Sequence, residues 1–528
     1  MKEFPSLPAP RMPDDCAERL WKRIPGYLRL TFLSAVVLGF ATHLYIFTNK
    51  LPNHDDIGHL FSADYGTASG RWLLPAVLKL DGAFSLSLPT GVLSVLCLAG
   101  VACFTVSLLR IRRPLSCVIT AAVLVTFPSV AATFSYMFTA DAYFFSLLLA
   151  VSGAWAAVRL PPWGSLLGTA AITLSMGIYQ SYFGMAAALM VGALLFETLD
   201  GQSSFRTLFL RGLRLAATLG AAVAAYMLLV RCTTRNVPLV DYMGISDMGH
   251  LSLGDLPHLV YQAYGQYVNF FLLQDLGYHF GFLKYALVLT GLCTVLLGVL
   301  VLREKRLGTA RTLLAAALAA VYPLAGNIIY VMVPGGNVHT LMLYGFTAIL
   351  IAPVALADYG GLGQGRREPF LRAGCGWVVA LSIALTAYSY FIADNTAYLK
   401  LDLSLRQCTA YSTRLLERIE TCEGYQPGTP VVLVGSDQAD DTLYPTPQLD
   451  RIQMIGVFDM AAYRTAYTYD LFLRDYLGFT GDVSLGDSEE ALALGRTAAV
   501  RSMPLYPAAG SVRLVDGAVV VKLNEPTG

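Results

Sequence analysis

The sequence predicts a multispanning α-helical membrane protein with about eleven spans and a small extracytoplasmic α/β domain at its C-terminus. Of its 528 residues, 55% are hydrophobic and 14% are charged, and the mean hydropathy is +0.55, whereas about a quarter of an ordinary soluble chain is charged. Eleven apolar runs have the length that crosses a bilayer. The pattern changes after residue 393, where charged residues and turn signals return.

The apolar runs define a membrane region, residues 27–393, which comes after a short polar segment, residues 1–26. That segment lacks the basic, apolar and small-residue order of a cleaved signal peptide, so we expect the first run to remain as an anchor. The fifth and sixth runs are short and nearly touch. The expected spans are 27–47, 85–109, 114–133, 141–158, 163–180, 182–198, 208–230, 281–302, 310–333, 340–358 and 373–392.

The distribution of basic residues predicts the orientation of these spans. Loops that are rich in Lys and Arg stay in the cytoplasm. With the N-terminus inside, the inside segments hold 20 basic residues and the outside loops hold 6, which include Lys50 and Arg71. An odd number of spans then carries the C-terminus out of the cell. We therefore expect a cytoplasmic N-terminus, with residues 394–528 outside.

Overall charge and cysteine content exclude several functional classes. The formal net charge of +1 favours neither nucleic acid nor a strongly acidic partner. No two of the nine cysteines have the spacing of metal ligands. Cys408 and Cys422 lie roughly 21 Å apart on one expected helix, too far for a disulfide. We expect free thiols.

The residues after 393 indicate a small α/β domain. A helical stretch, 395–420, leads to an apolar β-branched run, 430–436, that is typical of a buried strand ended by glycine. A further helical segment comes next, at 461–478. The last pattern, 512–523, predicts a β-hairpin with Asp516-Gly517 at its turn.

Two adjacent carboxylates, Asp55 and Asp56, come after the first span on the expected outer side. Neighbouring carboxylates repel, so one of them could serve in proton abstraction. The alternative is a pair of Asp residues that cap a helix beginning at Ile57. His54 and His59 could bind a divalent ion with them, although four ligands within six residues fit one metal poorly.

Arg71 lies in an outside loop that should be poor in cations, so it could bind a phosphate, or it could extend to lipid headgroups. Asp141 stands at the start of the fourth span, where helix capping explains it and where a functional role is the alternative. Further polar corners contain Tyr179, Gln180, Ser181 and Tyr182, then Asn337 and His339. An interfacial aromatic belt and a plain turn are the simpler interpretations of these corners. All of them share the expected outer side.

Four of these motifs together resemble the bacterial glucosyltransferase family named for the serotype-converting O-antigen glucosyltransferases, the glucosyl transferase II domain. They are NHDD (53–56), GRWL (70–73), FTADAY (138–143) and SMGIYQSY (175–182). Their order and spacing are more specific than any one of them. The resemblance covers roughly residues 30–390, and the segment beyond 394 is also similar to the region C-terminal to the membrane part in Gram-positive members.

This resemblance implies a membrane glycosyltransferase of the GT-C type in a bacterial cytoplasmic membrane. Such an enzyme moves a hexose, here glucose by the family label, from a polyprenyl-phosphate donor to a cell-surface glycan, with inversion. The resemblance places the base on Asp55 or Asp56 and the donor phosphate on Arg71. The candidate substrate-binding residues are His54, Trp72, Asp141, Tyr143, Tyr179, Gln180, Tyr182, Asn337 and His339. No metal ligands are assigned, and whether the enzyme uses a divalent cation is left undecided.

Two other classes compete with an enzyme. A transporter or flippase of a lipid-linked sugar usually shows repeated halves and polar residues at mid-membrane, whereas here the polar residues gather at the expected outer mouth. A structural membrane protein that binds surface polymer would leave the first-loop aspartates unexplained. The absence of a Walker loop and of a dinucleotide glycine motif agrees with a lipid-phosphate donor.

Overall fold

The computed structural model describes residues 13–62, 66–82, 84–235, 254–333, 337–359, 369–435, 447–465, 467–486 and 488–525. Within them, ten helices are long and apolar enough to cross a membrane, and the 15-residue α9 is a shorter apolar helix. The prediction of a multispanning helical protein with about eleven spans is confirmed. The eight cysteines whose side chains the structure describes are free.

The helices of the bundle match the predicted runs closely. They are α2 (Gly26–Thr48), α5 (Ser87–Leu108), α6 (Pro114–Thr126) with α7 (Pro128–Ser135), α8 (Ala140–Arg159), α9 (Gly164–Ile178), α10 (Phe183–Asp200), α11 (Phe205–Thr233), α13 (Leu283–Lys305), α14 (Thr309–Gly326), α16 (Thr347–Asp358) and α17 (Pro369–Glu420). A short amphipathic helix, α1 (Pro13–Arg23), precedes them. α10 is buried along most of its length, whereas α13 and α14 present apolar side chains outward, as lipid contact requires.

Two spans differ in detail from the apolar runs. The third is split at Phe127, because the residue before a proline is held out of the helical region and Pro128 restarts the helix. The ninth ends at Gly326 rather than 333, and a four-residue helix, α15 (Ile329–Met332), comes after it. Both breaks interrupt an apolar run of the bundle.

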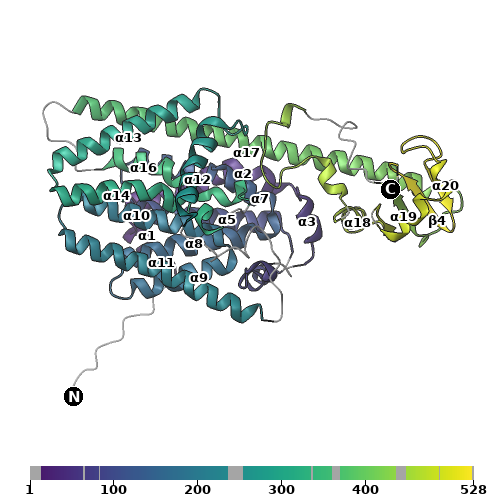
Figure 1. Ribbon diagram of the computed structural model, residues 1–528, viewed down its shortest axis with the longest axis horizontal. Coiled ribbons are helices and arrows are strands. Elements are labelled where there is room, and N and C mark those ends of the chain that lie inside the picture. The colour runs from purple at the N-terminus through teal and green to yellow at the C-terminus, as the bar shows by residue number, and fades with distance from the viewer. Residues whose placement is uncertain are drawn as a thin grey trace, which may run out of the picture.

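Short helices connect the spans at one end. They are α3 (His54–Gly58), η1 (Thr67–Ser69), α4 (Leu74–Leu78), η2 (Lys79–Asp81), η3 (Met137–Thr139), η4 (Gln180–Tyr182), α12 (Leu256–Val268), η6 (Asn269–Leu273) and η7 (Thr340–Phe346). We call this end the sheet-side end, because α17 continues from it to the C-terminal sheet (Figure 1). The cytoplasmic or external side of either end stays a prediction.

α17 spans 52 residues without a break, so it passes through the expected boundary at residue 394. The C-terminal sheet has the order β2-β1-β4-β3, formed by β1 (Val431–Val434), β2 (Val483–Ser484), β3 (Val512–Val515) and β4 (Ala518–Lys522). β1 pairs in parallel with β2 and β4, and β3 and β4 form an antiparallel hairpin. Asp516 and Gly517 both have positive φ at its turn, as predicted.

A stretch of the C-terminal region returns to the bundle. It contains η9 (Pro447–Leu449), η10 (Met460–Arg464), α18 (Tyr469–Leu471) and η11 (Phe472–Tyr476), while α19 (Glu489–Gly495) and α20 (Ala498–Arg501) stay beside the sheet. The Tyr463 hydroxyl donates to the Pro52 carbonyl at 2.8 Å, and the Ser135 hydroxyl donates to the Ile455 carbonyl at 3.4 Å. Residues from beyond α17 therefore cover part of the sheet-side end.

Candidate active site

Asp56 is fully buried and its carboxylate is saturated by three donors. Lys50 donates to Oδ2 at 2.9 Å, the Ser85 hydroxyl donates to Oδ1 at 2.5 Å, and the Phe138 amide donates to Oδ1 at 3.2 Å. The three donors lie on separate segments of the chain, so this carboxylate fastens α3 to the segments around it. The Asp56 carboxylate is thus enclosed by protein groups.

Asp55 lies in a different environment, because 29% of its side chain is exposed. The ionisable group within ion-pair distance of it, among the described residues, is His54, whose Nε2 is 3.4 Å from Asp55 Oδ1. Burial lowers the pKa of His54, and the charge of Asp55 opposes that shift. His54 is thus kept neutral at physiological pH, which leaves the Asp55 carboxylate free of a permanent cation.

The expectation that the aspartates cap a helix beginning at Ile57 is wrong. α3 begins at His54, and its N-cap is Asn53, whose side-chain oxygen accepts from the Asp56 amide at 2.8 Å. Asparagine is as good a cap as aspartate, and it occupies the first position where the chain leaves its extended conformation. The carboxylates are thereby released from capping.

His59 is also committed within this segment. Its Nδ1 lies 2.8 Å from the Asp55 carbonyl oxygen, and its ring stacks on Phe138 at 4.4 Å. Among the residues that the structure describes, no three His, Cys, Asp or Glu side chains come together as a metal site.

Arg71 is buried within a cluster of tyrosines. Its Nη1 donates to the Tyr143 hydroxyl at 2.7 Å, and its guanidinium lies 5.2 Å from the Tyr179 ring. The two rings stack on each other at 4.2 Å. Only 5% of Arg71 is exposed, so the loop that the sequence places at the surface folds into the bundle.

The same loop is held by residues of the fourth motif. The Gln180 amide donates to the Ser69 carbonyl at 3.1 Å and to the Tyr226 hydroxyl at 2.9 Å. Trp72 packs directly on Gly177, where an added Cβ would lie 2.6 Å from the indole ring. The four motifs of the sequence therefore meet in one network, since Phe138 contacts Asp56 and Tyr143 contacts Arg71.

Two further candidates lie at the edge of this network. Tyr182 is buried and meets Tyr179 and Tyr344 edge-on, at 5.1 and 6.0 Å. Asp141 is the second residue of α8, so it is not the N-cap, which is Thr139. Its carboxylate accepts from the adjacent Ala142 amide at 2.8 Å and is partly exposed. Aspartate in a first helical turn is favoured by the helix dipole.

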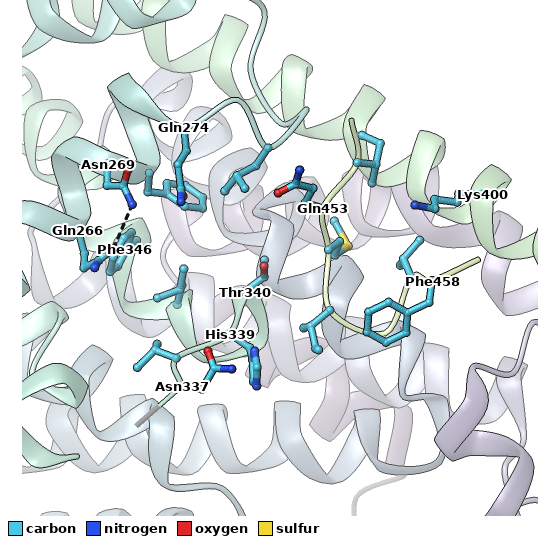
Figure 2. Close-up of a pocket in the computed structure, with 18 of the residues that line it drawn as sticks. Gln266, Asn269, Gln274, Asn337, His339, Thr340, Phe346, Lys400, Gln453 and Phe458 are labelled. Carbon is cyan, nitrogen blue, oxygen red and sulfur yellow. Dashed lines mark hydrogen bonds between the residues drawn. The ribbon is translucent and has the colours of Figure 1, made fainter. Parts of the chain in front are cut away.

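A polar cavity of about 650 Å³ opens at the sheet-side end (Figure 2). One wall comes from α12 and η6, a second from residues 337–346, and a third from residues 450–458. Asn337 and His339 both line it, and burial lowers the pKa of His339. The side-chain amides around them belong to Gln266, Asn269, Gln274 and Gln453.

The cavity reaches the first-loop aspartates through Phe458. This residue lines the cavity, and its ring meets His54 edge-on at 5.3 Å. His54 in turn lies beside Asp55. Asp55 is thus connected to the cavity wall through His54 and Phe458, whereas neither Asp55 nor Arg71 is among the described residues that line the cavity.

Three polar residues of this end were missed by sequence reasoning. Lys50 and Ser85 bind Asp56, and Lys400 lines the cavity. Lys50 had a signal, because it is one of few basic residues in the expected outside loops. Lys400 had none, since it lies on the part of α17 beyond the apolar run, where charged residues are common.

Comparison with protein families agrees with the motifs. The family model described as Glucosyl transferase GtrII matches residues 44–350, which is more than half of the chain. The chain belongs to the glucosyl transferase GtrII family. No curated protein and no solved structure matches it significantly. Family membership establishes a membrane glucosyltransferase in general terms, and the matched region contains all four motifs with Asn337 and His339.

The match also ends before two parts of the cavity. Lys400 and residues 450–458 lie outside the GtrII region. The family-defining part of this glycosyltransferase therefore supplies the motif network and two cavity walls, while the remaining wall is built by residues C-terminal to it.

Proposed function

We propose that this GtrII protein transfers a hexose, with glucose as the family's sugar, from a polyprenyl-phosphate carrier to a cell-surface glycan, and that Asp55 is the general base. One observation carries the choice of base. Asp56 is buried and accepts from three donors, whereas Asp55 is partly exposed next to His54, whose ring packs on Phe458 of the cavity wall. A base must reach the proton that it removes.

The proposed reaction needs no further reagent. The acceptor hydroxyl attacks the anomeric carbon, its proton moves to Asp55, and the bond between that carbon and the phosphate oxygen breaks. The electron pair of that bond leaves with the phosphate, and the configuration at the anomeric carbon is inverted. Because the lipid phosphate is the leaving group, the protein has to supply a base, a cation and positioning.

The cavity supports the binding part of this proposal. Its volume of about 650 Å³ falls in the range of small-molecule sites. Side-chain amides donate and accept hydrogen bonds at once, which suits sugar hydroxyls. The aromatic rings of Phe270, Phe346 and Phe458 in the lining offer apolar faces to a sugar ring. We place Asn337 and His339 among the sugar-binding residues on these grounds.

The test compares the two carboxylates in the full chain, purified into lipid nanodiscs. Transfer of labelled hexose from undecaprenyl-phosphate glucose to cell-envelope polysaccharide is the readout. We expect Asp55→Asn to lower kcat by about 10²–10⁴-fold, the usual contribution of a general base, with an unchanged thermal midpoint. Asp255→Asn, an exposed aspartate of the same end, is the control and should keep full activity.

Full activity in Asp55→Asn would remove Asp55 as the base. The flippase alternative is checked with the same protein in vesicles, by tracking labelled donor across the bilayer. Movement of the donor without any transfer to glycan would replace the proposed enzyme by a transporter.

A further inference from the structure

The third wall of the cavity contains a buried cation that no motif predicts. Lys400 lies on α17, and 7% of its side chain is exposed. It lines the cavity together with Gln453 and Phe458 (Figure 2). Lysine is almost never buried unless its charge is paired, so its partner decides what it does there.

The partner of Lys400 is a weak one. Among the described residues, the acidic group within ion-pair distance is Asp459, and Lys400 Nζ is 3.5 Å from its Oδ1. That distance exceeds a normal hydrogen bond. The Asp459 side chain is 52% exposed, so this carboxylate can turn into solvent when another anion arrives. Lys400 thus has its charge inside a cavity and a partner that can be displaced.

The position along α17 fits an anion at the membrane surface. The last apolar run ends at residue 392, and Lys400 lies beyond it by roughly 12 Å along the helix axis. The headgroup layer extends about 5–8 Å beyond the hydrocarbon core on each side, so Lys400 lies at its outer edge, where the headgroup of a carrier lipid that projects from the bilayer would meet it. Lys400 is the basic residue and Asp450 the acidic residue in the described lining, and Asp450 is exposed at the rim.

We propose that Lys400 binds the phosphate of the polyisoprenoid carrier, and that residues 450–458 close the cavity over the bound headgroup. The proposal rests on the function proposed above, and it assigns the phosphate to a residue outside the GtrII region. Arg71, which the family resemblance favours, is held by Tyr143 and Tyr179. Lys400 is the cation that faces the cavity.

Direct binding tests this assignment without any sugar transfer. The full chain in nanodiscs is titrated with undecaprenyl phosphate and with undecaprenol, which has the same tail and no charge. We expect Lys400→Gln to weaken phosphate binding by about tenfold or more, which corresponds to about 1.4 kcal/mol, and to leave undecaprenol binding unchanged. Lys79→Gln, an exposed lysine of the same end, should bind both lipids as wild type does.

A second variant moves affinity the other way. Asp459→Asn removes the competing carboxylate, so undecaprenyl phosphate should bind a few-fold more tightly, and Lys400→Arg should retain binding. A purely structural ion pair predicts instead that Lys400→Gln and Asp459→Asn lower the thermal midpoint with no change in phosphate affinity. That result would overturn the proposal, and Asp459→Asn remains informative if Lys400→Gln fails to fold.

Two further arms separate the source of the phosphate and the two proposals. Binding of soluble poly(glycerol phosphate) is measured with the same variants. If Lys400→Gln loses this binding but still binds undecaprenyl phosphate, Lys400 belongs to an acceptor site and its assignment to the carrier is overturned. Asp55→Asn should bind undecaprenyl phosphate like wild type. If Asp55→Asn stays active while Lys400→Gln no longer binds undecaprenyl phosphate, Asp55 is not the base and Lys400 is still the phosphate-binding residue. If Asp55→Asn loses activity while Lys400→Gln binds undecaprenyl phosphate as wild type does, only the assignment of Lys400 is rejected.

Discussion

The motif network and the cavity lie at the same end of the bundle, and they use polar residues in opposite ways. In the network, Arg71, Asp56 and Gln180 are enclosed and donate to or accept from other protein groups. In the cavity, amides and Lys400 face open space. Polar motifs that stand out in a sequence can therefore hold the fold together. The residues that face a cavity can come from segments without any motif.

The largest effect should come from breaking the network at Asp56. Asp56→Ala leaves Lys50 without its carboxylate, although it still donates to Ser85. Because Lys50 is about one-third exposed, we expect a loss near the lower end for buried pairs, about 3 kcal/mol. Thermal unfolding in detergent measures it. Asp55→Ala is the neighbouring control and should unfold like wild type. Equal stability of the two variants would remove the distinction between these carboxylates.

Next in size is the attachment of the third cavity wall. Gly456 has φ +83°, and an added Cβ would lie 2.0 Å from Ser135 Oγ. Gly456→Ala should cost about 2 kcal/mol from backbone strain and overpacking, and it should lift residues 450–458 from the bundle and weaken donor binding. Gly428→Ala is the matched control, with φ +91° and open space around it.

A double variant sharpens that result. Ser135→Gly removes the hydroxyl that the new methyl group would strike, so Gly456→Ala combined with Ser135→Gly should recover part of the donor affinity. If donor binding in Gly456→Ala equals that in Gly428→Ala, residues 450–458 do not form a functional wall.

Arg71→Met addresses the role of the buried guanidinium. Loss of its hydrogen bond to Tyr143 should lower stability by about 1.5–3 kcal/mol, the range for charged donors, with unchanged affinity for undecaprenyl phosphate. The double-mutant cycle with Tyr143→Phe should be non-additive, since the two residues are in contact. A selective loss of phosphate affinity with intact stability would instead return the phosphate to Arg71.

The smallest effect is a dependence of stability on pH. Burial lowers the pKa of His279 to about 4, against an opposing contribution from Asp275. Between pH 6.5 and 4 the unfolded chain takes up a proton that the folded chain refuses, so stability is full above 6.5 and falls as the pH decreases. At pH 5 the loss should be about 2 kcal/mol. His279→Gln should flatten this slope in thermal unfolding curves, and an unchanged slope would contradict it.

Much of the fold could be predicted because its determinants are local. Apolar length indicated the spans, and Asp516-Gly517 indicated the hairpin. The choice between Asp55 and Asp56 could not be made, because adjacent residues share one sequence context. Their difference comes from Ser85 and Phe138, far along the chain. Arg71 was expected at the membrane surface because it lies in an expected outside loop, and its burial depends on contacts with Tyr143 and Tyr179.

The cavity was the least predictable part of the site. Asn337 and His339 were found as a polar corner of a turn, which suggested nothing about the residues that would face them. Lys400 and residues 450–458 reach the same space through the course of α17 and the return of the chain after β1. Such long-range closure leaves no periodic pattern in the sequence.

The unbroken α17 has a mechanical consequence. At about 1.5 Å per residue its 52 residues extend about 78 Å, and a bilayer core takes up only about 30 Å. The remainder acts as a lever arm between the lipid and the sheet. The side chains of Leu405, Leu415 and Ile419 are buried along that part of α17, so one continuous helix joins the lipid-facing bundle to the sheet.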